Sequence, residues 1–136
     1  MKLIEYFKLL NLEYKNFVVL VRFGNFYKCF DDDTLIFSYL FDYKIKDNAV
    51  GFPISTLGKI VLTLKNKNIS LIMVKDEENI INYEVIKNNY NIILKEAKEN
   101  LEYKNKLNEI SNKVKILLEQ DINNYEKIMN YLVKFN

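Results

Sequence analysis

Histidine and tryptophan are absent from this 136-residue chain, and cysteine occurs once. Without histidine, the chain has no imidazole for acid–base catalysis near neutral pH or for a histidine metal site. The single cysteine, Cys29, excludes an internal disulfide and a thiolate zinc cluster, and it fits a reducing compartment. We expect Cys29 to be a small buried residue on a strand. The alternative, a nucleophile, would want a basic partner, and histidine is missing.

Glycine is also scarce, and its three copies, Gly24, Gly51 and Gly58, lie far apart. No glycine-rich phosphate loop and no GxxxxGK[ST] segment is present, which excludes a P-loop ATPase within this sequence. Carboxylate pairs such as Glu77 and Glu78 fall in a predicted turn, where solvent surrounds them. No catalytic constellation emerges, so the sequence predicts a protein that is not an enzyme and that holds neither a metal nor a cofactor.

Charge and long apolar runs are limited as well. The 20 basic and 18 acidic residues leave a net charge of only +2, so any basic surface for nucleic acid must be local. No apolar run reaches the roughly 18 residues of a membrane span. The N-terminal segment carries Glu5 and Lys8 and lacks the features of a signal peptide, so we expect a cytoplasmic location.

What the chain does have is enough apolar sequence, 49% of its residues, to bury a core. The apolar periodicity predicts alternating helices and strands in the first part of the chain. In chain order these are a helix over 1–14, strands over 16–23 and 26–30, a helix over 31–42, strands over 43–47 and 50–53, a helix over 54–66, and strands over 68–74 and 80–86. This order predicts an α/β or α+β domain over residues 1–86, a mixed sheet covered by helices.

Three consecutive aspartates, Asp31, Asp32 and Asp33, precede the helix that follows the second strand. We expect one of them to cap this helix and the others to occupy its first turn, where the helix dipole favours negative charge. A metal site is the alternative, although neighbouring aspartates at a helix start point in different directions.

Residues 87–136 contain no glycine and no proline, and apolar residues recur there three or four positions apart. The pattern predicts a C-terminal extension that is either one long helix or, with a break near 119–123, a helical hairpin. Its apolar stripe needs a partner surface. That surface is either the first domain or the other arm of a hairpin, or it is a second copy of the chain in a coiled coil.

The segment "VRFGNFYKCFDDDT" (21–34) and its successors resemble the N-terminal mismatch-recognition domain of MutS DNA mismatch repair proteins. In that family a hydrophobic strand leads to a Gly-Asp/Asn-Phe-Tyr-Glu turn, an acidic helix start, a Gly-[Ile/Phe]-Pro segment, a helix and a strand. The matching pieces here, within about residues 1–75, are Gly24-Asn25-Phe26-Tyr27, Asp32-Asp33, Gly51-Phe52-Pro53, the helix to about 66, and residues 70–74. The resemblance implies a mixed sheet flanked by helices.

In this family the phenylalanine of the turn stacks on a mispaired base from the minor groove of kinked DNA, and by position that residue is Phe26. The family's glutamate two residues on, which hydrogen-bonds the displaced base, is replaced here by Lys28. A lysine donates hydrogen bonds and cannot accept them, so general or structure-directed binding becomes more probable than family-type mismatch selection. Arg22, Asn25 and Tyr27 complete the nucleic-acid-binding residues that we expect. The competing interpretations are core packing for Phe26 and solvated charges for Arg22 and Lys28.

The sequence includes no counterpart of the MutS clamp, lever and ATPase domains, so we expect it to serve other nucleic-acid machinery. The resemblance suggests a non-catalytic accessory that binds DNA or an RNA–DNA duplex. MutS-like accessories occur beside the reverse transcriptase of diversity-generating retroelements, so a reverse transcriptase or a repair system is a possible partner. The alternative is a protein–protein adaptor that uses the MutS-like scaffold and the C-terminal helices, with self-association through residues 88–136.

Overall fold

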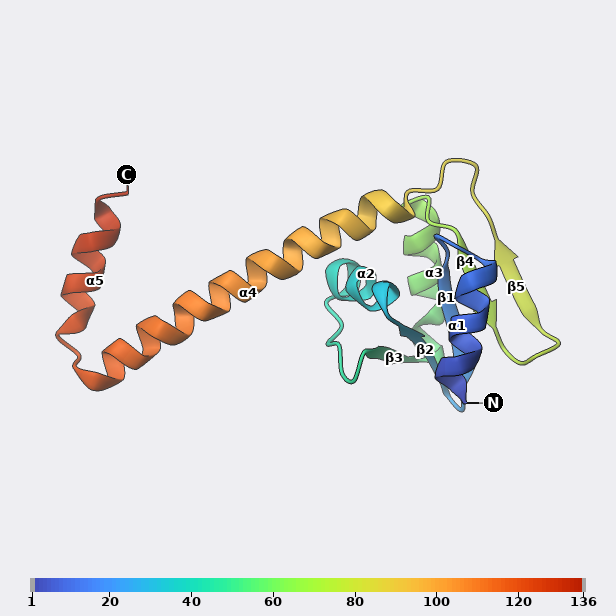
Figure 1. The fold of residues 1–136 in the computed structure, drawn as a ribbon, viewed down its shortest axis with the longest axis horizontal. Coiled ribbons are helices and arrows are strands. Elements are labelled where there is room, and N and C mark those ends of the chain that lie inside the picture. Colours follow the sequence, from blue (N-terminus) through green and yellow to red (C-terminus); the bar gives the residue numbers. More distant parts are fainter. Residues whose placement is uncertain (1, 136) are drawn as a thin grey trace. The chain divides into compact units, whose positions relative to one another are not determined.

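The computed structural model describes residues 2–135, and its first part is a five-stranded mixed sheet flanked by helices (Figure 1). The strands lie in the order β3-β2-β1-β4-β5. Their bounds are Val18–Phe23 (β1), Phe26–Phe30 (β2), Ala49–Pro53 (β3), Leu71–Val74 (β4) and Ile80–Tyr83 (β5). The β1/β4 pair is parallel, and the other three pairs are antiparallel. The predicted α/β class and mixed sheet are confirmed.

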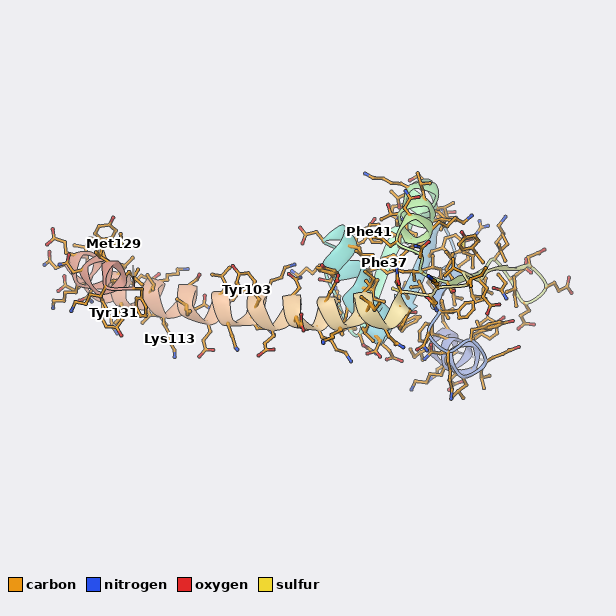
Figure 2. All side chains as sticks on the ribbon, turned by 90° about the horizontal axis from the view of Figure 1, so that it is seen from above. Phe37, Phe41, Tyr103, Lys113, Met129 and Tyr131 are labelled. Carbon is orange, nitrogen blue, oxygen red and sulfur yellow. The ribbon has the colours of Figure 1, made fainter. Side chains whose placement is uncertain are left out.

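Helices cover both faces of the sheet, since apolar side chains alternate between the faces along each strand. Helix α1 (Leu3–Glu13) covers one face, where Phe7 and Leu10 pack on side chains from β1, β2 and β4. The other face packs against α2 (Asp32–Phe41), α3 (Leu57–Asn66) and the start of α4 (Tyr90–Gln120). The blue α1 and the green α3 lie on opposite sides of the sheet in Figure 2.

An aromatic cluster lies between α2 and the β2 and β3 strands, at the β3 edge of the sheet. Phe52 of β3 stacks on Phe37 of α2, with 5.6 Å between ring centroids, and on Tyr43 at 6.1 Å. Phe41, labelled with Phe37 in Figure 2, contacts Phe37 at 5.1 Å. Tyr27 of β2 stacks on the same Phe52 ring at 6.2 Å. The cluster therefore packs β2 and β3 against α2 and the loop that carries Tyr43.

The strand predicted at 43–47 is wrong. Asp42 ends α2 in the left-handed conformation, and a tight turn with positive φ at Asp47 and Asn48 follows, which confirms the predicted turn. Between them only a single bridge forms, from Lys46 to Ala49. The alternation in this segment reflects a loop that turns Tyr43 and Ile45 towards the core.

The aspartate run has a different role from the expected cap. Helix α2 begins at Asp32, so Asp32 and Asp33 lie in its first turn as predicted, but no side chain caps the helix. Asp33 is buried, and its carboxylate accepts hydrogen bonds from the Val19 N–H at 2.9 Å and from the Tyr90 hydroxyl at 2.6 Å. Asp31 occupies the N-cap position, as expected for one of the three, but its side chain makes no capping hydrogen bond and instead accepts one from the Asn48 amide. Asp33 turns inward and bonds β1 and α4. In residues 2–135 no group of three potential metal ligands forms, so the structure offers no site for the metal alternative.

Two compact units make up the chain, residues 1–99 and 100–136. The first unit ends inside α4, because Tyr90, Ile93, Leu94 and Ala97 are buried in its core. The second unit contains the rest of α4 and α5 (Asn124–Val133), separated at residues 121–123. The predicted break near 119–123 is present, and the tail is two helices. No helix in the described range is long and apolar enough to cross a membrane.

Candidate nucleic-acid interface

The hairpin of β1 and β2 ends in a two-residue turn, Gly24-Asn25. Of these two residues only Gly24 has a positive φ, +61°, which is the pattern of a type II′ hairpin turn and favours glycine. Arg22 Nε donates a 3.0 Å hydrogen bond to the Gly24 carbonyl. The Asn25 carbonyl accepts a 3.0 Å bond from the Ile54 N–H, just after β3. The turn is thus held by its own strand and by the neighbouring one.

Two phenylalanines flank this turn and form the last pair of the hairpin ladder, Phe23 opposite Phe26. Both side chains lie on the face that α1 covers, since directly opposed residues share a face. Phe26 is 48% exposed and Phe23 is 58% exposed, because α1 covers the middle of the sheet and not this end. On the next strand Pro53, also exposed, lies opposite Phe26. The hairpin end therefore presents an exposed apolar edge.

Lys28 lies on the same face as these rings, two ladder pairs further from the turn. Its Nζ atom is 4.8 Å from the centroid of the Phe23 ring, a cation–π contact. Its stem passes Gly51 of β3, where an added Cβ would come within 3.6 Å of the Lys28 Cγ atom. The lysine is partly buried, so its ammonium group is held beside the exposed rings rather than free in solvent.

Arg22 and Tyr27 lie on the opposite face from Phe26 and Lys28. They oppose each other in the ladder, one position out of phase with Phe23 and Phe26. Arg22 is exposed and approaches the β4–β5 loop: the pKa of Asp76 is lowered mainly by a hydrogen bond from Asn79, with a smaller contribution from the Arg22 charge. The charge of Arg22 thus acts on an acidic residue of the β4–β5 loop.

Tyr27 is 1% exposed and belongs to the aromatic cluster. Burial raises the pKa of its hydroxyl above the ordinary value. Its ring has no surface left for a ligand, so we correct the expected direct contact to a supporting role beneath the turn. The period of a strand explains the difference: Tyr27, next to the exposed Phe26, must point to the other face.

The structure thus brings Phe26, Lys28 and the turn residue Asn25 to one end of the sheet and separates them from Arg22 and Tyr27. It adds Phe23, which the sequence pattern placed at the end of a buried strand. The sequence did contain a signal for Phe23. Two residues that flank a two-residue hairpin turn oppose each other as the last pair of the ladder, so their side chains lie on the same face. Cys29 is buried on β2, as expected, and burial raises the pKa of its thiol well above the ordinary value.

Fold and hairpin together define a small mixed-sheet domain that presents aromatic side chains at one end. Residues 1–107 match the family MutS domain I, and the chain belongs to this family. The match extends past the resemblance at 1–75 and includes β5 and the first half of α4. Among curated proteins, no similar sequence is found.

Proposed function

We propose that this protein is a non-catalytic nucleic-acid-binding accessory that contacts distorted or mismatched duplex through an aromatic wedge at Phe26. Membership in the MutS domain I family and the aromatic cluster fit a DNA-binding domain of the mismatch-recognition type. The observation that carries the proposal is the half-exposed Phe26 ring at the end of a turn with hydrogen bonds on both sides.

The wedge would act through the energy needed to open a base step. Unstacking one step costs a few kcal/mol, and an apolar side chain inserted into the step recovers part of it. A mismatched or flexible step is cheaper to open, so the same wedge binds it more tightly. A rigid wedge is needed, because a mobile ring would lose its own entropy on insertion. The cluster beneath β2 and the Asn25–Ile54 bond supply that rigidity.

Lys28 determines how strongly we expect the protein to discriminate between different mispairs. Every base pair exposes acceptor atoms in the minor groove, so a donor there discriminates poorly between bases. The Lys28 ammonium group, held beside the ring of Phe23, can also pair with a phosphate. We therefore expect a preference for deformable duplex sites rather than for one kind of mispair. An RNA–DNA duplex is an equally suitable target, and the accessory role would serve a reverse transcriptase or a repair system.

Binding to a mismatched duplex, a matched duplex and an RNA–DNA hybrid tests the proposal, with Phe26→Ala beside the wild type. We expect Phe26→Ala to weaken binding to the distorted duplex by about 5- to 100-fold, since stacking on an aromatic side chain contributes roughly 1–3 kcal/mol per base. Leu62→Ala is a matched control, because Leu62 is 60% exposed on α3, outside the hairpin. If a folded Phe26→Ala protein binds all three as the wild type does, the wedge is refuted.

A protein–protein adaptor is the second candidate function, and the second unit favours it. No residue in 100–135 is buried, although apolar side chains recur along α4 and α5. Leu107, Ile110, Val114 and Leu117 follow the three-and-four spacing of a helix that packs on another. Leu117 also lines a groove with Ile128 and Leu132 of α5. A unit with so little core of its own gains stability from a bound surface.

Sedimentation of the intact chain and of residues 1–99 separates the two functions. The shorter chain keeps the core residues Tyr90, Ile93, Leu94 and Ala97, which a cut after residue 86 would remove. The adaptor function predicts that the intact chain associates or captures a partner and that 1–99 does neither. Leu107→Lys with Val114→Lys in the intact chain should then abolish association. Monomers in every case, with no captured partner, would argue against the adaptor.

A further inference from the structure

The hairpin end carries two exposed rings where the wedge needs only one. Phe23 and Phe26 oppose each other across adjacent strands, with Cα atoms about 5 Å apart by ladder geometry. They share a face, and both are about half exposed. A ligand stacked on both rings would remove this apolar surface from water, which favours binding.

We propose that Phe23 and Phe26 form a two-ring surface for two consecutive unpaired bases, with Lys28 paired to the phosphate between them. This inference rests on the proposed nucleic-acid function and names its ligand: a short unpaired stretch within a duplex, in preference to a single mispair. Each aromatic ring can stack one base, and aromatic residues on neighbouring strands of an exposed sheet face stack successive bases in single-stranded nucleic acid.

The position of the charge agrees with this arrangement. The Lys28 ammonium group lies 4.8 Å from the Phe23 ring centroid, on the same face as both rings. Two bases stacked on the two rings must be joined by a phosphate beside them, within reach of a lysine side chain. Gly51, which has no side chain, lets the stem of Lys28 lie along β3 and bring its ammonium group to the rings. Arg22 lies on the opposite face and cannot take this part.

A single mispair supplies one displaced base and would occupy one ring. A two-nucleotide bulge supplies two unpaired bases and the phosphate between them, so it would occupy both rings and the lysine. The structure therefore assigns different roles to the two rings: Phe26 contributes to every distorted site, and Phe23 contributes where a second unpaired base is present.

Fluorescence anisotropy with the full chain tests this, using matched, single-mismatch and two-nucleotide-bulge duplexes with the same flanking sequence. We expect the wild type to bind the bulge at least 5-fold more tightly than the mismatch. Phe23→Leu should weaken bulge binding by about 5- to 100-fold and leave mismatch binding within about 2-fold. Phe23→Tyr, which keeps the ring, should bind as the wild type does, and Leu62→Ala is again the control.

The outcomes separate this inference from the proposed function. If Phe26→Leu weakens binding and Phe23→Leu does not, the two-ring surface is refuted and the single wedge stands. Stacking of a second base on Phe23 is refuted if Phe23→Leu weakens binding to all three duplexes equally. It is also refuted if the wild type binds the mismatch more tightly than the bulge. If neither substitution changes binding and both proteins melt as the wild type does, both proposals fail.

Discussion

The hydroxyl of Tyr90, the first residue of α4, donates a 2.6 Å hydrogen bond to the buried carboxylate of Asp33, at the start of α2. The second carboxylate oxygen accepts the Val19 N–H on β1. One side chain therefore joins a strand and two helices across 57 and 14 residues of sequence. Because a buried carboxylate without partners costs several kcal/mol, this contact selects the arrangement in which both partners are present.

Removing the Tyr90 hydroxyl should destabilise the first unit. In Tyr90→Phe one Asp33 oxygen loses its donor while it stays buried, which costs about 1–3 kcal/mol of unfolding free energy. Urea denaturation measures this loss. Tyr39→Phe is the matched control, because the Tyr39 hydroxyl bonds Glu96 at the surface and its loss should cost less than about 0.5 kcal/mol. Equal losses of unfolding free energy in both variants would mean that the bond to Asp33 stabilises the protein no more than a surface hydrogen bond does.

Stability should fall as pH rises from about 4 to about 7. Burial raises the pKa of Asp33 from 3.8 to about 7, although the bonds from Tyr90 and Val19 oppose the shift. A raised folded-state pKa means that the folded protein holds the proton more tightly than the unfolded chain. This stabilisation is complete below the unfolded pKa and is lost as pH passes about 7, with an upper limit of about 4 kcal/mol.

Thermal melts between pH 4 and 8 test this dependence with a pair of neighbouring substitutions. Asp33→Asn should flatten the profile, since the group no longer titrates. Asp32→Asn alters an exposed carboxylate one residue away and should keep the slope of the wild type. A wild-type profile that rises through this range would show that Asp33 is ionised at little cost.

Two glycines should respond to alanine with opposite signs. Gly24 has a φ of +61° and open space around its Cα, so Gly24→Ala meets no neighbour and pays only for the left-handed backbone, about 1 kcal/mol. Gly58 lies within α3 with open space and no positive φ, so Gly58→Ala should add up to about 1 kcal/mol of stability. Chemical denaturation gives both values. A neutral Gly24→Ala would mean that the turn relaxes.

Replacing Lys28 with the glutamate of the family pattern should lower the affinity for duplex and raise the preference for mismatched over matched duplex. In Lys28→Glu the attraction to phosphate becomes repulsion, so binding to every duplex should weaken. The ratio of mismatched to matched affinity should rise, because a carboxylate accepts from a base where a lysine cannot. Lys28→Met isolates the charge and should lower the slope of log affinity against log salt by about 1. An unchanged slope would place Lys28 away from phosphate.

Local pattern was sufficient for much of the fold. The Gly24-Asn25 turn predicted a hairpin, and the break near 119–123 divided the tail, because turn chemistry and helical periodicity depend on neighbours in sequence. The same reasoning failed at 43–47, where an alternating loop imitates a strand. Alternation of apolar and polar residues shows only which side chains face the core. A loop that packs on the core can show the same alternation as a strand.

The candidate site could be predicted only in part. The turn and the family pattern predicted Phe26 and Lys28 as site residues, and the structure places both on one face. Phe23 was missed and Tyr27 was placed in the wrong environment, because the pattern gives the phase of a strand and not how far the covering helix extends. Phe23 and Phe26 lie outside the cluster that α1 forms with the sheet, and both are exposed.

By itself the sequence determined the class of fold, the hairpin and the tail helices, since each of these follows from local spacing and residue type. Its motifs also resemble MutS domain I, and the match over residues 1–107 shows that family. Tertiary structure decided which residues are accessible and which are paired. It made Asp33, in the first turn of α2, a buried link to Tyr90, set Lys28 over Phe23, and assigned Arg22 to the opposite face. Burial and long-range hydrogen bonds depend on segments far apart in the chain, so no local pattern contains them.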